Sequence, residues 1–122
     1  MKISTKITQA FHFEAAHRLP NVSEKHRCYR LHGHSYRVEL MLAGAVDPRS
    51  GFVVDFFDIE DAFAPLRETL DHHYLNEIEG LENPTAELIA VWIFDRIKPR
   101  LEQLASVKVF ETPDCWAEYD GV

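Results

Sequence analysis

The stretch Cys28–His34, Cys-Tyr-Arg-Leu-His-Gly-His, contains residue types that bind transition metals. His32 and His34 are two residues apart, so in an extended backbone both imidazoles point to the same face. Gly33 between them has no side chain, which lets the backbone turn tightly or lie close to something bound. Cys28 lies four residues before His32, in a polar stretch where a thiol would not be buried.

A metal site needs a third ligand, because a catalytic zinc takes three protein ligands and leaves a fourth position open. His17 is the candidate, since it ends an alternating apolar run and would leave the end of that apolar face. The alternative is that His17 is a strand-end histidine bonded to the backbone, while His32 and His34 are ordinary surface residues. The three histidines with Cys28 nearby are typical of a catalytic zinc site that leaves a thiol free for chemistry.

Further polar side chains are candidates for the same site. Asp71 and His72 form a carboxylate–imidazole pair if the backbone folds them together, although neighbouring residues do not automatically touch. Thr85 and Glu87 open a predicted helix, where ordinary first-turn chemistry explains them without any ligand, since an acidic side chain there suits the helix dipole. Glu111 ends a predicted strand, and its simplest interpretation is a solvated carboxylate at a sheet edge.

A long polar loop, residues 18–31, separates His17 from His32. Loops of this length without secondary structure are usually functional. This one places a basic patch in an otherwise acidic protein, which suits a phosphate-bearing ligand; a solvated loop is the alternative. The basic residues are Lys25, His26, Arg27 and Arg30.

Hydrophobic periodicity predicts the elements that must position these residues. The predicted strands cover residues 4–16, 35–44, 52–56, 107–112 and 115–119, and the predicted helices cover residues 57–70 and 83–101. Asp55 is expected to cap the first helix and Asn83 the second, with Pro84 at its first position. Leu88, in the second helix, is expected to be part of the core.

Composition limits the classes of function. A chain of 122 residues suits one domain spanning residues 1–122. The net charge of −7 argues against broad binding to nucleic acid. The sequence has no apolar run of membrane-spanning length, and its first residues lack the apolar region of a signal peptide. Two cysteines are too few for a disulfide scaffold, so we expect free thiols in the cytoplasm.

Taken in order, these motifs resemble one family. Phe13-Glu-Ala-Ala-His-Arg-Leu, the Cys28–His34 stretch, Leu70-Asp-His-His-Tyr-Leu-Asn, Glu82-Asn-Pro-Thr and Glu111-Thr together resemble the 6-pyruvoyl-tetrahydropterin synthase family over essentially the whole chain. The Cys-x-x-x-His-Gly-His spacing resembles its queuosine-pathway branch, which makes 6-carboxy-tetrahydropterin. Biopterin-making relatives typically have a longer insertion there, and a folate-pathway relative carries glutamate in place of the cysteine.

The resemblance implies an α+β tunnelling fold, with an antiparallel four-stranded sheet and two helices on one side. Three subunits would close their sheets into one barrel, and two trimers would stack as a homohexamer. Such closure removes exposed sheet edges. The active sites would then lie between subunits.

The resemblance also implies an activity: conversion of 7,8-dihydroneopterin triphosphate to 6-carboxy-tetrahydropterin, acetaldehyde and triphosphate. Rival interpretations are a biopterin-type synthase and a non-catalytic scaffold that binds metal or pterin. By motif position, the implied roles are zinc binding for His17, His32 and His34, proton abstraction for Cys28, general acid–base catalysis for Asp71 and His72, pterin anchoring for Glu111, and secondary ligand contacts for Thr85 and Glu87.

Overall fold

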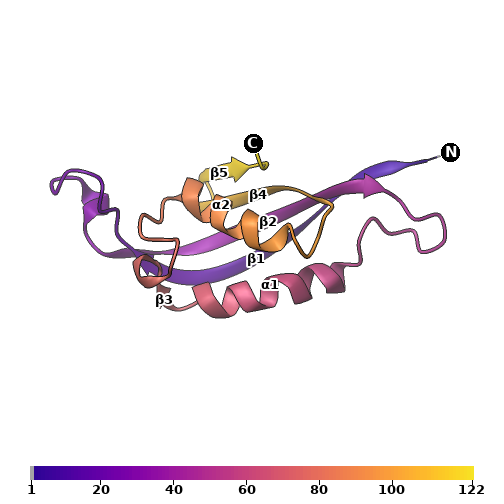
Figure 1. Ribbon diagram of the computed structural model, residues 1–122. Helices are drawn as coiled ribbons and strands as arrows, with labels where there is room; N and C mark the ends of the chain where they lie inside the picture. The colour runs from indigo at the N-terminus through magenta and orange to yellow at the C-terminus, as the bar shows by residue number, and fades with distance from the viewer. Residues whose placement is uncertain (1) are drawn as a thin grey trace.

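Two long antiparallel strands dominate the computed structural model, which describes residues 2–122. Strand β1 covers Ser4–His17 and strand β2 covers His32–Ala45. They pair without interruption from Ser4 opposite Ala45 to His17 opposite His32. Both strands are longer than predicted, and β2 includes the two histidines that precede the predicted strand. The loop that joins them extends beyond the sheet (Figure 1).

Three shorter strands complete the sheet. Strand β4 (Leu104–Thr112) pairs with β2 and forms a hairpin with β5 (Cys115–Tyr119), while the two-residue β3 (His73–Tyr74) runs parallel to β1. The strand order is β3-β1-β2-β4-β5. The sheet therefore has five strands, not the four that the resemblance implies. The extra strand is too short to show any periodicity, and the α+β class is as predicted.

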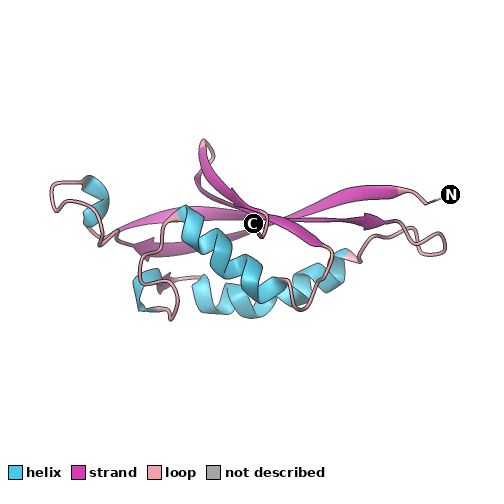
Figure 2. Ribbon diagram, turned by 45° about the horizontal axis from the view of Figure 1, so that its top comes forward, coloured by secondary structure: helices cyan, strands magenta, loops and turns pink. Residues whose placement is uncertain are grey.

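Helices α1 (Phe56–Leu70) and α2 (Ala86–Ile97) cover one face of this sheet (Figure 2). Alternate residues of the strands face the helices and form one apolar core. Phe13 and Tyr36 stack in it with ring centroids 4.8 Å apart. Residues of the opposite face, such as His12 and Arg37, are exposed. No helix within residues 2–122 is long and apolar enough to cross a membrane.

The connections differ from the prediction in three places. Residues 52–56 form no strand, and α1 already begins at Phe56. Asp55 is the predicted cap of α1, since its carboxylate accepts a hydrogen bond from the Phe57 amide. Thr85, not Asn83, caps α2, because its hydroxyl accepts from the Leu88 amide. Leu88 itself is 43% exposed and is not part of the core.

Candidate active site

His17, His32 and His34 form a compact cluster where β1 and β2 end. One ring nitrogen from each lies within 4.8 Å of the others. The strand register explains the cluster: His17 pairs directly with His32, and Ala15 pairs with His34, so all three side chains leave the same face of the sheet. His32 and His34 therefore lie on the same face, as predicted, and His17 is the third histidine of the cluster.

His17 is completely buried and its ring is fixed at one nitrogen. Nδ1 lies 2.8 Å from the carbonyl oxygen of Pro84 and 3.1 Å from the hydroxyl oxygen of Tyr36. A carbonyl oxygen only accepts, so Nδ1 carries the proton and Nε2 has the lone pair. Nε2 is buried without a hydrogen-bond partner among residues 2–122. Burial lowers the pKa of His17 from 6.5 to about 4, which keeps the ring neutral.

Each of the other two histidines shares one of these features. Nδ1 of His32 lies 2.7 Å from the Arg30 carbonyl oxygen, which leaves its Nε2 free. Burial lowers the pKa of His34, an effect that the nearby Glu111 carboxylate opposes. Neutral imidazoles whose other nitrogen bonds a carbonyl oxygen are the usual state of metal-binding histidines. The cluster can hold a metal ion, and the unpartnered Nε2 of His17 is the atom that such an ion would satisfy.

Glu111, near the end of β4, brings a carboxylate to this cluster. Its Oε2 lies 3.7 Å from Nε2 of His17 and 3.9 Å from Nε2 of His34. The side chain remains 28% exposed, so one side of the carboxylate is open to a ligand. Glu111 is thus more than the solvated edge residue of the simplest interpretation. Pterin anchoring stays a prediction, now for a group adjacent to the candidate metal ligands.

Cys28 lies on the protruding loop, within a single 3-10 turn, Arg27–Tyr29. The turn is held by the His26 ring, whose Nδ1 accepts from the Cys28 amide, and by the Leu19 amide, which donates to the Cys28 carbonyl oxygen. The thiol is half-buried and free. It is not part of the three-histidine cluster.

Asp71 and His72 do form the predicted carboxylate–imidazole pair. Oδ2 of Asp71 lies 2.9 Å from Nδ1 of His72, whereas His73 contacts only the Asp71 carbonyl oxygen. The pair is held against β1 because the Glu14 amide donates to Asp71 Oδ1 and the His72 amide donates to the Glu14 carbonyl oxygen. The hydrogen bond from the Glu14 amide and the contact with His72 lower the pKa of Asp71. His72 has a positive φ of 59°, a backbone conformation that costs energy outside glycine.

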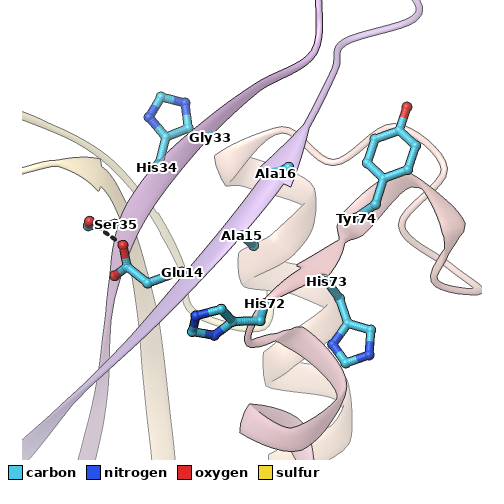
Figure 3. A pocket seen from close by; sticks show the side chains of 9 residues that line it. All are labelled: Glu14, Ala15, Ala16, Gly33, His34, Ser35, His72, His73 and Tyr74. Atoms are coloured by element: carbon cyan, nitrogen blue, oxygen red, sulfur yellow. Dashed lines mark hydrogen bonds between the residues drawn. The ribbon is translucent and has the colours of Figure 1, made fainter.

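A cavity of about 520 Å³ lies between β1, β2 and β3 beside this pair. Figure 3 shows His34, His72 and the hydrogen-bonded pair Glu14 and Ser35 at its wall. His34 is the residue that belongs to both the cavity and the histidine cluster. His72 and His34 thus line one cavity, but within residues 2–122 neither Cys28 nor the Asp71–His72 pair is part of the three-histidine cluster.

The remaining candidates have structural partners. The Thr85 hydroxyl caps α2, the role predicted for Asn83, and Glu87 lies exposed in the first turn, which matches its simplest interpretation. In the predicted basic loop, His26 caps the 3-10 turn. Arg18, at the start of that loop, donates from Nε to the Tyr29 carbonyl oxygen and lies over the Tyr29 ring. A ligand role for Thr85 and Glu87 stays a prediction.

Two contacts of His17 were not predicted from the sequence. Pro84 is 67 residues away along the chain, and nothing in the sequence indicates that its carbonyl oxygen meets the ring. Tyr36 did have a signal, because it follows His34 on the same face of β2. The missing information was the pairing of β1 with β2, which brings the His17 ring to the Tyr36 hydroxyl.

The whole chain resembles proteins of known sequence and structure. The family described as 6-pyruvoyl tetrahydropterin synthase matches residues 6–122. A Synechocystis sp. protein named 6-carboxy-5,6,7,8-tetrahydropterin synthase is 42% identical over 119 residues, covering 93% of this chain and 91% of that protein. A Drosophila melanogaster 6-pyruvoyl tetrahydrobiopterin synthase is 33% identical over 132 residues, covering 94% and 79%. The solved Caenorhabditis elegans 6-pyruvoyl tetrahydropterin synthase has a TM-score of 0.91 at 28% identity, covering 98% and 97% of the two chains. These matches confirm the predicted resemblance and the tunnelling fold.

Proposed function

Because the chain belongs to the 6-pyruvoyl tetrahydropterin synthase family, we propose that it is a 6-carboxy-5,6,7,8-tetrahydropterin synthase. This lyase converts 7,8-dihydroneopterin triphosphate and water to the carboxy-pterin, acetaldehyde and triphosphate, a step of the queuosine pathway. The observation that carries the proposal is the short Cys28–His34 motif, whose two histidines join the buried His17 in one cluster. The Synechocystis relative, which is named for this activity, supports the choice of branch.

Zinc is the proposed metal, held by His17, His32 and His34. Three neutral imidazoles suit zinc, and a three-histidine set leaves a position open for substrate. When bound, zinc supplies a Lewis acid that polarises substrate oxygens and favours loss of the adjacent protons. The chain's contribution is to hold one ring nitrogen from each histidine within 4.8 Å of the others and, by burial, to lower the pKa values of His17 and His34, which favours their neutral rings.

The proton transfers are assigned to the chain's own side chains. Cys28 is proposed as the base that removes a substrate proton, because the thiolate is the reactive form of cysteine. Asp71 orients His72, which donates and accepts protons at its exposed ring, in line with their 2.9 Å contact. Glu111 accepts two hydrogen bonds from the amino-pyrimidine edge of the pterin. Thr85 and Glu87 are secondary contacts.

Assembly of these groups requires more than one subunit. We infer a homohexamer built from two trimers, in which the Asp71–His72 pair of one subunit meets Cys28 and the histidine cluster of another. Within residues 2–122 the Asp71–His72 pair is not part of the histidine cluster, which supports this arrangement. So do the free edges of the sheet, because β5 and most of β1 have an unpaired side among residues 2–122. A cytoplasmic location fits the two free cysteines.

A biopterin-type synthase is the alternative within the family, and the Drosophila relative favours it. Such an enzyme would use the same metal and thiol but would release no acetaldehyde. A non-catalytic scaffold is the alternative if the protein is not an enzyme. It would bind metal or pterin but would need neither Cys28 nor the Asp71–His72 pair.

The test is Cys28→Ala, with Cys115→Ala as the matched control, since Cys115 is an exposed thiol in the β4–β5 hairpin. We expect Cys28→Ala to retain zinc while turnover of 7,8-dihydroneopterin triphosphate falls about 10²-fold or more. The control should keep both. Unchanged turnover in Cys28→Ala would show that the proposed base is wrong, and absence of turnover in the wild-type hexamer would favour the scaffold.

A further inference from the structure

Tyr36 lies completely buried against the histidine cluster, although it is not itself a candidate ligand. Its ring meets the rings of His17 and His34 edge to face, with centroids 5.9 Å and 5.4 Å away. On the core side it stacks against Phe13 with an interplanar angle of 9°. The hydroxyl therefore emerges from an apolar stack directly at the site.

This hydroxyl contacts His17 at Nδ1, with the two atoms 3.1 Å apart. The same nitrogen lies 2.8 Å from the Pro84 carbonyl oxygen, so two oxygens from separate segments meet one ring atom. Nδ1 carries one proton, so the Tyr36 hydroxyl oxygen accepts it together with the Pro84 carbonyl oxygen. The carbonyl oxygen fixes the tautomer, and the two acceptors together fix the ring plane, because rotation of the imidazole would break at least one of the contacts. Nε2 on the opposite side of the ring is then held in the cluster with its lone pair free.

Packing alone does not explain the hydroxyl. A buried hydroxyl is unfavourable unless it is hydrogen-bonded, and phenylalanine would fill the same space beside Phe13 without that cost. The Tyr36 oxygen is instead placed on the nitrogen that controls His17. Partners of this kind orient metal-binding histidines, and losing one typically weakens metal binding 10- to 100-fold.

We propose that Tyr36 is a positioning residue, which with Pro84 orients the His17 ring for metal binding. The proposal rests on the metal centre of the proposed function but not on its reaction. Its consequence is that the chain holds His17 in its binding geometry before metal arrives, whereas His34, 20% exposed at its side chain, has a ring with solvent on one side.

The experiment compares zinc affinity in Tyr36→Phe and wild type, by competition with a chromophoric chelator. Tyr119→Phe is the control, because Tyr119 is a half-buried tyrosine that packs against Phe94 in another part of the fold. We expect Tyr36→Phe to bind zinc about 10- to 100-fold more weakly, with the metal-free melting temperature close to that of wild type. The control should bind like wild type.

The outcomes separate the two proposals. Equal zinc affinity in Tyr36→Phe and wild type would overturn the role of Tyr36 and leave the metal centre intact. A wild-type chain that binds no zinc would overturn the metal centre, and this inference with it. If Tyr36→Phe fails to fold, proton NMR of wild type decides. We expect the Nδ1 proton of His17, which the Tyr36 and Pro84 oxygens share, to exchange slowly with water before zinc is bound, and rapid exchange in the metal-free protein would refute the proposal.

Discussion

Acidification from pH 6.5 to pH 4 should destabilise the metal-free chain, because His17 is held neutral in the folded state. Its pKa falls from 6.5 to about 4 on folding, mainly through burial. Between these values the unfolded chain binds a proton at His17 and the folded chain does not. The free energy of unfolding therefore rises with pH across this window, and the stability is lost as the pH falls toward 4.

The magnitude follows from the shift. Each unit of pKa difference corresponds to about 1.4 kcal/mol, so at pH 4.5 His17 alone costs roughly 2 kcal/mol relative to pH 7. That is a substantial part of the stability of a small domain, typically about 5–15 kcal/mol. His34, whose pKa is also lowered by burial, adds a contribution of the same sign. Asp71, whose pKa is lowered from 3.8, contributes only below this window.

The assay is urea unfolding of the chelator-treated protein at fixed protein concentration, at several pH values, for wild type and His17→Gln. Glutamine does not titrate, so the difference between the two pH profiles isolates His17. We expect the wild type to lose roughly 2 kcal/mol more than His17→Gln between pH 7 and pH 4.5. Parallel profiles would refute the conclusion that burial keeps His17 neutral, and with it the argument that the cluster is prepared for metal.

Other variants test the supports of the site. Thr85→Ala should lower the free energy of unfolding by about 1 kcal/mol, because it removes the cap of α2; thermal melting checks this, and an unchanged melting temperature would contradict the cap. Gly33→Ala would place a Cβ 3.2 Å from the Ala15 carbonyl oxygen, so β1 and β2 must separate slightly; chelator competition should show weaker zinc binding, and wild-type affinity would mean that the strands absorb the change. Asp71→Asn should retain zinc but lower turnover about 10²-fold, because His72 loses its ionic partner; metal analysis with single-turnover kinetics measures both, and full turnover would exclude the acid–base role.

Much of the site could be predicted because it depends on the alternation of side chains between the two faces of a strand. The alternation around Phe13 and Tyr36 placed His17, His32 and His34 at the ends of apolar faces, and the register joins those faces. The Asp55 cap was equally local, since a carboxylate two residues before the amide that it accepts from needs no tertiary information.

The errors concern features that tertiary contacts decide. Strand β3 has two residues and exists only because Ala15 and Ala16 of β1 lie beside it. Residues 52–56 have strand-like composition but no partner strand within the described chain. Leu88 fits the apolar pattern of α2 yet lies exposed, which an interface with another subunit would explain.

The central claim is tested most directly by mass spectrometry of the products that the zinc-loaded protein forms from 7,8-dihydroneopterin triphosphate. The account predicts 6-carboxy-tetrahydropterin together with acetaldehyde and triphosphate. A pyruvoyl-pterin without acetaldehyde would contradict it and assign the chain to the biopterin-type branch, with the same histidine cluster and thiol.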